Sequence, residues 1–429
     1  MEPTILQRND HNVSRKDISQ AALKVLYRLH ERGYKAYLAG GCVRDLLLGK
    51  HPKDFDVVTD ATPNEVRRCF SHCRLIGRRF RLAHVIYGDE VIEVATFRAA
   101  GSADEISEEE RDNNSLVHEE TGVVLRDNVF GTPEEDAFRR DFTINALFYN
   151  IADFSIIDYV GGLSDIEKKV VRAIGDPDQR YQEDPVRMIR ALRFASSLGI
   201  DIEENTYEAI LRQREHLAHA SHARMYEEIL KFFYSGSMND AFDQWCETGL
   251  LDVMFPGFAP WVRETATETD IAWLRVGLQQ MDKWKSHKVK ASPELLYTLF
   301  LAPYIRAKTA ETANQDEPTP DDLLNALQTL QEELAARILI PRRILYRMND
   351  ILKVQDRFSD RSHPERNQRF VRRPFFRDAL VFFKIDLLAR GENQAKLIAA
   401  WSRDLAQAPA PGPQRREPSR RPRRRRPRR

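Results

Sequence analysis

Hydrophobic positions follow a short period near the start of this chain and a longer period toward its end. In roughly the first 150 residues, apolar runs such as YKAYLAGG, FDVVT and RLAHVIYGDEVIEVATF lie between turn residues, which predicts strands. The last run is expected to form two strands that turn at Gly88 and Asp89. Apolar residues spaced three and four apart predict a helix over residues 14–32, opened by a capping box at Ser14. This part is therefore predicted to mix helices and strands.

Beyond Pro185 the period is almost entirely that of a helix. It predicts helices over 185–197, 270–284, 293–305, 321–338, 376–390 and 392–408. The polar stretch TAETANQDEPTP predicts a loop over residues 309–320, and residues 409–429 are rich in Pro and Arg. No run of about 18 apolar residues occurs, so no membrane span is expected.

Composition fits a water-soluble protein of several domains. A chain of 429 residues predicts about three domains, and its 42% apolar residues can build sizeable cores. The N-terminal stretch MEPTILQRND lacks the basic and apolar regions of a signal peptide. Four scattered cysteines do not form a disulfide framework, which favours a reducing compartment. The predicted location is the cytoplasm.

Charge is distributed very unevenly along the chain. Residues 414–429 hold ten arginines and one glutamate, a net charge of +9, within a chain whose net charge is +1. The remaining residues therefore carry −8. Blocks of like charge are usually disordered and attract polyanions, most often nucleic acid. A disordered RNA-binding tail is predicted for residues 409–429, with Arg423, Arg424, Arg425 and Arg426 as its contacts.

Paired aspartates in KDFDVVT are the first candidate chemistry. Side chains two apart on a strand share a face, so Asp54 and Asp56 should project together while Phe55 points into the opposite layer. Two neighbouring carboxylates need a cation, or one of them must take up a proton. If the partner is a cation, oxygen ligands suit Mg²⁺ shared with phosphate. Two such ions can promote phosphoryl transfer. Glu93 in VIEVATF could reach the same ions. The alternative is a set of solvated acids at strand ends and edges.

The GGCVRD stretch, just upstream, adds a candidate phosphate contact. Gly40 and Gly41 would let the backbone approach a phosphate, and Arg44 would supply positive charge. A Gly-Gly turn alone is weak evidence, so its weight comes from the aspartates that follow it.

Four stretches together resemble the class II nucleotidyltransferases, which comprise CCA-adding tRNA enzymes and bacterial poly(A) polymerases. They are LAGGCVRDLLLGKHPKDFDVVTDATP, RRDFTINALFYN, DYVGGLSDI and EDPVRMIRALRFASSLG. The resemblance covers residues 15–255 and implies an α+β fold with a polymerase-β-like head and an all-helical neck and body. The expected parts are an extension (1–17), head (18–175), neck (176–260), body (261–408) and disordered basic tail (409–429).

The resemblance also implies roles for individual residues. Asp54 and Asp56 match metal ligands, Glu93 matches a third carboxylate, and Asp141 matches an active-site aspartate. By their chemistry, Arg139 and Arg140 suit a triphosphate and Asn145 suits a ribose hydroxyl, unless all three belong to a structural polar network. Arg190, in the fourth stretch, is also expected to bind the nucleotide.

The EDPVR segment predicts how a base is chosen without a template. Asp184 is expected to cap a helix that starts at Pro185, with Arg187 projecting from its first turn. An acceptor beside a donor matches the edge of adenine and also that of cytosine, but not guanine or uracil. The resemblance supports this use of the pair. The alternative is a capping Asp beside a solvated Arg.

Two features favour AMP addition over CCA addition. LIGRRFRLAHV resembles a segment of bacterial poly(A) polymerases, and its Arg78, Arg79 and Arg81 could follow an RNA strand. The arginine tail suits an RNA partner of no fixed sequence. The predicted function is template-independent transfer of AMP from ATP to single-stranded RNA 3′ ends, with two Mg²⁺ ions. The resemblance links such tailing to RNA decay and its proteins. The alternatives are a CCA-adding enzyme and a non-catalytic RNA-binding scaffold.

Overall fold

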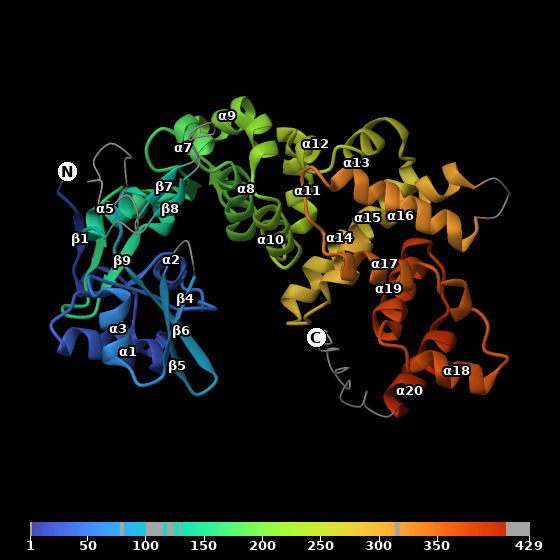
Figure 1. Ribbon diagram of the computed structural model, residues 1–429, viewed down its shortest axis with the longest axis horizontal. Coiled ribbons are helices and arrows are strands. Elements are labelled where there is room, and N and C mark those ends of the chain that lie inside the picture. The colour runs from blue at the N-terminus through green and yellow to red at the C-terminus, as the bar shows by residue number, and fades with distance from the viewer. Residues whose placement is uncertain are drawn as a thin grey trace, which may run out of the picture. The chain divides into compact units, whose positions relative to one another are not determined.

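The protein forms two compact units (Figure 1). The computed structural model describes residues 2–77, 81–99, 130–313 and 318–408, together with the backbone of 115–117 and 124–127. The first unit contains Met1–Ala259 and Glu333–Leu339, and the second contains Pro260–Glu332 and Ile340–Arg429. Each unit is described by itself.

An eight-stranded sheet forms the centre of the first unit. Its order is β1 (Thr4–Leu6), β10 (Ile156–Asp158), β9 (Leu147–Asn150), β2 (Ala36–Ala39), β3 (Asp56–Thr59), β6 (Glu90–Thr96), β5 (Leu82–Tyr87) and β4 (Cys73–Ile76). Neighbouring strands are antiparallel except β3 and β6, which are parallel. Two small sheets pair β7 (Ser115–Val117) with β8 (Val124–Asp127) and β11 (Val170–Val171) with β12 (Asp201–Ile202). The predicted turn at Gly88 and Asp89 is confirmed, since it joins β5 to β6.

Helices α1 (Gln20–Glu31) and α3 (Pro63–Cys69) cover one face of this sheet (Figure 1). Leu26 of α1 and Val57 of β3 are fully buried between the layers. The helix predicted from residue 14 starts later, because the Ser19 hydroxyl accepts the Ala22 N–H and caps α1. Ser14 opens a separate 3-10 turn instead.

The opposite face carries a second, smaller core. Val58 of β3 and Phe148 of β9 are buried there, with Ala137 of the short helix α5 (Pro133–Phe138). A 3-10 turn at Thr143–Asn145 follows α5 and leads into β9. Partly buried Tyr37 and Tyr159 pack against this core.

A set of helices continues the first unit after the sheet. They are α6 (Gly162–Lys168), α7 (Pro177–Glu183), α8 (Val186–Leu198), α9 (Glu204–Gln213), α10 (His222–Phe233), α11 (Met238–Thr248), α12 (Leu250–Met254) and α13 (Phe258–Pro260). Helix α8 packs against α10 and α11, and the buried rings of Phe232 and Trp245 meet edge to face at 4.9 Å between α10 and α11.

The later part of the chain is helical, as its period predicts. The helices are α14 (Glu268–Ser286), α15 (Pro293–Thr312), α16 (Pro320–Leu334), α17 (Arg342–Leu352), α18 (Pro364–Val371), α19 (Phe376–Ala389) and α20 (Ala395–Gln407). The loop expected from residue 309 is shorter than predicted, because α15 continues to Thr312. Phe358, Phe370, Phe376 and Trp401 form an aromatic cluster beside α18. None of the helices described is long and apolar enough to cross a membrane.

Candidate active site

A row of ionisable side chains crosses three neighbouring strands on one face of the sheet. Asp56 opens β3 and lies opposite Glu93 of β6 in the parallel register. Glu93 in turn lies opposite His84 of β5, and its Oε1 is 3.4 Å from His84 Nε2. Directly opposed residues share a sheet face, so the three side chains project to the same side. His84 was not predicted from the sequence, because its link to Glu93 depends on strand register.

The alternation around Asp56 follows the prediction, although the strand is shorter than expected. Phe55 is buried in the core beneath α1 and α3, so the carboxylates on either side of it turn away from that core. Asp54 lies in a bend before β3 rather than in the strand, which corrects the expectation that both aspartates are strand residues. Its exposed carboxylate is 3.5 Å from Lys53 Nζ.

The electrostatics at Asp56 favour uptake of a cation. Partial burial, followed by repulsion from Glu93 and Asp54, raises the pKa of Asp56 to about 6, while Arg140 acts against this rise. Water still reaches Asp56, which is an exposed residue by surface area. Crowded carboxylates that resist ionisation are stabilised by a bound metal ion.

The donor set fits Mg²⁺ that is shared with a substrate. Within the described ranges, no group of three Asp, Glu, His or Cys side chains is arranged to hold a metal ion. Mg²⁺ does not require such a cage, since it usually binds one or two carboxylates and takes its other ligands from water and phosphate. The adjacent carboxylates of Asp56 and Glu93, with Asp54 near them, supply that number of oxygen ligands.

The Gly-Gly turn allows a close approach between two segments. Gly40 precedes α2 (Gly41–Leu47) with φ +78°, and a Cβ there would lie 3.1 Å from Arg140 Nη1. Both the positive φ and this contact favour glycine. The Arg140 side chain therefore lies directly against the turn, and close enough to Asp56 to lower its pKa.

Arg44 is buried behind this turn. Its guanidinium donates to Asn145 Oδ1, and its Nε and Nη2 donate to Asp45 Oδ1 at 2.9 and 2.7 Å. The ring of Phe194 lies 5.2 Å from the guanidinium carbon. The structure thus places Arg44 where it orients Asn145.

Asp136, which was not predicted from the sequence, holds the two arginines expected to bind triphosphate. Its buried carboxylate accepts from Arg139 Nε at 3.1 Å and from Arg140 Nη2 at 2.8 Å. Burial alone would raise the pKa of Asp136, but the two guanidinium groups lower it. Asp136 lies three and four residues before the arginines, a helical spacing that could have revealed it.

A charged network joins the sheet domain to the helices that follow it. The Asp141 carboxylate accepts from both Nε and Nη2 of Arg190 on α8, the first at 2.8 Å, and from Asn145 Nδ2 at 3.2 Å. Arg190 Nη1 lies 3.4 Å from Glu228 on α10, and Arg193 Nε lies 3.1 Å from the same carboxylate. Burial would raise the pKa of Asp141, yet Arg190 and the other donors lower it to about 2.

The two residues expected to read the base each have a partner. Both oxygens of Asp184 accept from Arg224 of α10 at 2.7 Å, and Arg187 Nη1 donates to Glu183 Oε2 and to the Arg180 carbonyl at 3.0 Å. The predicted capping role of Asp184 is wrong, because α8 begins at Val186 and has no side-chain cap. A bidentate partner 40 residues away outcompetes a local cap.

The residues expected to contact RNA are mostly outside the described ranges. Arg81 is described and lies exposed just before β5. Arg78, Arg79, Arg423, Arg424, Arg425 and Arg426 fall outside those ranges.

Comparison with known proteins finds related families along most of the chain. Residues 36–172 match the family described as "Poly A polymerase head domain", residues 199–262 match "Probable RNA and SrmB-binding site of polymerase A", and residues 315–429 match "Polymerase A arginine-rich C-terminus". The chain is 42% identical to poly(A) polymerase I of Salmonella typhi over 96% of its own length and 87% of that protein. It is 41% identical to poly(A) polymerase I of Escherichia coli O6:H1 over 95% of its length and 86% of that protein.

A solved structure shares the fold. The Bacillus stearothermophilus CCA-adding enzyme in complex with CTP aligns with a TM-score of 0.62 and 26% sequence identity. The alignment covers 90% of this chain and 82% of that one. The expected architecture of a nucleotidyltransferase head followed by helices is thereby confirmed.

Proposed function

This chain belongs to the poly(A) polymerase I family of nucleotidyltransferases, and we propose that its sheet face at Asp56 and Glu93 is where AMP is joined to RNA. Its activity is the template-independent transfer of AMP from ATP to RNA 3′ ends. In that reaction the 3′-hydroxyl oxygen bonds to the α-phosphorus, the bond to the β-phosphate oxygen breaks, and pyrophosphate leaves.

The carboxylates of β3 and β6 carry this assignment. Asp56 and Glu93 lie side by side on one face, and repulsion among these carboxylates and Asp54 favours binding of a cation. Asp54, Asp56 and Glu93 would hold Mg²⁺ there. When bound, two such ions supply charge to the attacking and leaving oxygens of an in-line displacement.

Fixed arginines at the same face would receive the triphosphate. Asp136 and the Asn145 carbonyl fix the Arg140 guanidinium beside Gly40, so it needs little reordering when phosphate arrives. Arg139 shares the Asp136 carboxylate and would contribute charge from the same turn. Asn145, oriented by Arg44 and Asp141, would contact the ribose.

Asp184 and Arg187 retain the hydrogen-bonding capacity needed to read adenine. Arg224 uses one acceptor position on each Asp184 oxygen, and a carboxylate oxygen has two. Arg187 uses Nη1 for Glu183 and Arg180, which leaves donors on Nε and Nη2. The carboxylate would accept from the adenine amino group, and the guanidinium would donate to ring nitrogen N1.

The proposed activity is tested by incubating the protein with unstructured RNA, Mg²⁺ and one nucleoside triphosphate at a time. Long tails made from ATP alone are the expected product. Addition of CTP to tRNA that lacks its 3′ end, or no extension of either RNA, would reject the proposal.

Changing the base-reading pair should relax nucleotide choice in the same assay. Arg187→Ala and Asp184→Asn are each expected to lower the preference for ATP by about tenfold to a hundredfold, because one good bidentate base contact discriminates by roughly 1–3 kcal/mol. The measurement is kcat/KM for each of the four nucleoside triphosphates on one RNA primer.

Asp178→Asn is the matched control for this change. Asp178 belongs to α7 and pairs with Arg212 at the surface, at 2.8 Å, so its removal should leave nucleotide choice unchanged. If Arg187→Ala and Asp184→Asn both keep the parent preference, the pair does not read the base.

The RNA substrate is also expected to contact basic residues outside the sheet face. We place Arg78, Arg79, Arg81 and the tail arginines Arg423, Arg424, Arg425 and Arg426 along its phosphates. The family match at residues 199–262 supports RNA binding by this chain. A cytoplasmic location and an association with RNA-decay proteins belong to the same proposal, which pull-down of RNA-degrading enzymes from cell extract would test.

Deleting residues 409–429 should weaken RNA binding and leave single-nucleotide addition largely unchanged. Each phosphate of a single strand that an arginine neutralises adds about −0.7 to the slope of log binding constant against log salt. The slope should therefore become flatter in proportion to the number of phosphates that the tail binds. Fluorescence anisotropy over a salt series measures it. An unchanged slope would mean that the tail does not touch RNA.

A further inference from the structure

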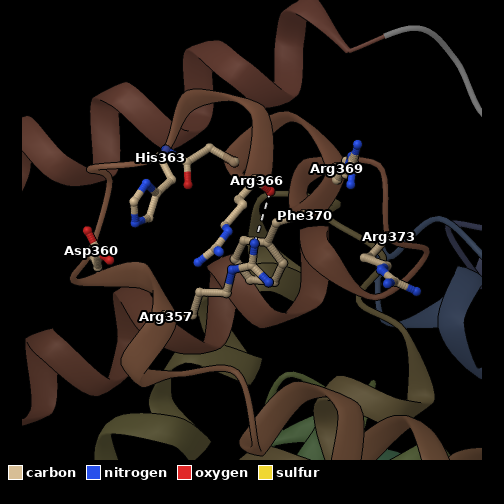
Figure 2. Close-up of a pocket in the computed structure, with 8 residues that line it drawn as sticks. Arg357, Asp360, His363, Arg366, Arg369, Phe370 and Arg373 are labelled. Carbon is tan, nitrogen blue, oxygen red and sulfur yellow. Dashed lines mark hydrogen bonds between the residues drawn. The ribbon is translucent and has the colours of Figure 1, made fainter.

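A basic pocket lies in the second unit, formed by residues around α18 (Figure 2). It has a volume of about 540 Å³, within the size range of ligand sites. The lining residues are Arg357, Asp360, His363, Arg366, Asn367, Arg369, Phe370 and Arg373. Four arginines therefore share the pocket with a single acid, which is the charge pattern of an anion site.

Three of these arginines are available to a ligand. Arg366, Arg369 and Arg373 are exposed, and none of them forms an ion pair with another part of the chain that the structure describes. Asp360 supplies one negative charge, which does not balance four arginines, and the remaining like charges cost free energy when they are gathered together. A bound polyanion would remove that cost.

The fourth arginine is already fixed in place. Arg357 Nη2 donates to the Arg366 carbonyl at 2.9 Å, and its guanidinium carbon lies 4.4 Å from the centre of the Phe370 ring (Figure 2). Phe370 is itself buried and packs edge to face on Trp401 at 5.7 Å. A guanidinium held in this way loses little freedom when it binds, which favours affinity.

We propose that this pocket binds the phosphodiester backbone of single-stranded RNA, as a second RNA contact in addition to the catalytic face. Guanidinium groups match phosphate oxygens in geometry and charge, and contacts to the backbone carry no sequence preference. Such a contact suits an enzyme whose product is a growing homopolymer. The inference rests on the proposed RNA substrate.

The test compares two full-length triple variants that remove the same charge. The pocket variant carries Arg366→Ala, Arg369→Ala and Arg373→Ala. The control carries Arg372→Ala, Arg377→Ala and Arg403→Ala, three exposed arginines that do not line the pocket. Binding of a long, labelled oligoadenylate is followed by anisotropy over a salt series, and AMP addition is measured on that primer and on triadenylate.

The pocket variant should bind the long RNA about tenfold more weakly than the control, with a salt slope flatter by about 0.7 for each phosphate that is no longer bound. Its KM for the long primer should rise, while extension of triadenylate stays at the parent rate. If both variants bound the long RNA equally weakly, the loss would be explained by the lower net charge alone, and the inference would be overturned. The inference would also be overturned if inorganic phosphate raised the melting temperature of the parent while the pocket variant bound the long RNA as tightly as the parent does. If the parent itself extends neither primer, the proposed function is rejected instead.

Discussion

Asp56→Asn is expected to reduce AMP addition by at least about a thousandfold in kcat/KM, with the fold intact. Metal-ion stabilisation of transition-state charge amounts to several kcal/mol, and each 1.4 kcal/mol corresponds to about tenfold in rate. Asparagine keeps the size of the side chain but removes the charge that would hold Mg²⁺. Asp54→Asn should have a similar effect, because it removes the neighbouring carboxylate.

The Asp56→Asn variant should lose activity without any loss of thermal stability. Burial and the negative charge of Glu93 disfavour the ionised form of Asp56 and raise its pKa to about 6. Near neutral pH this ionised form is a cost to folding, so a neutral side chain should leave the melting temperature equal or higher. A catalytic loss caused by misfolding would instead come with a lower melting temperature.

Glu90→Gln provides the matched control on the same strand. Glu90 opens β6, is exposed, and lies at the hairpin end opposite Tyr87 of β5. Its position is an odd number of residues from Glu93, so it projects to the other face of the sheet. Extension rates with saturating Mg²⁺ are compared for the parent and the three variants. Near-parental activity of Asp56→Asn would exclude this face as the catalytic site.

Asp141→Ala should lower the free energy of unfolding by about 2–3 kcal/mol, because it leaves the half-buried Arg190 guanidinium without its main partner. Both Nε and Nη2 of Arg190 donate to this one carboxylate. The pKa of Asp141 is lowered to about 2, so its stabilisation is present above the ordinary carboxyl pKa and is lost as pH falls through about 2. Urea denaturation of the first unit measures the change.

The double variant Asp141→Ala, Arg190→Ala distinguishes the loss of charge pairing from a loss of packing. Removing both charges should restore part of the stability, since no unpaired charge remains buried. The control is Glu208→Ala, which breaks an exposed pair with Arg212 at 3.3 Å and should cost less than about 1 kcal/mol. If Asp141→Ala unfolds at the same urea concentration as the parent, the network does not hold the helices to the sheet domain.

The sequence predicts which side chains are buried where this depends only on neighbouring residues. The Asp54, Phe55 and Asp56 alternation is sufficient to place one aromatic ring in the core and two acids away from it, and the structure agrees. Helix boundaries are less secure, because Ser14 and Ser19 each cap a turn, and the sequence pattern does not show which of them opens the long helix.

Hydrogen-bond partners that lie far apart along the chain could not be predicted from the sequence. Arg44 resembles a phosphate ligand beside two glycines, but Asn145, 101 residues later, accepts its guanidinium inside the protein. Asp184 resembles a helix cap, yet Arg224 binds both of its oxygens. In each case one partner lies far along the chain, 101 residues away for Arg44 and 40 for Asp184, and local spacing carries no information about it.

One helix, α10, imposes a constraint on anyone who wishes to re-engineer nucleotide choice. Its Arg224 pairs with Asp184 of the proposed base-reading pair, and its Glu228 pairs with Arg190, so substitutions that tilt or shift α10 would be expected to alter both nucleotide choice and stability. Glu183 pairs with Arg187 and Arg180, so substituting it should change the position of Arg187 without altering α10. A library that varies Glu183 while leaving α10 intact should therefore yield more folded variants with altered selectivity than a library built on α10, as sorting by solubility and nucleotide preference would show.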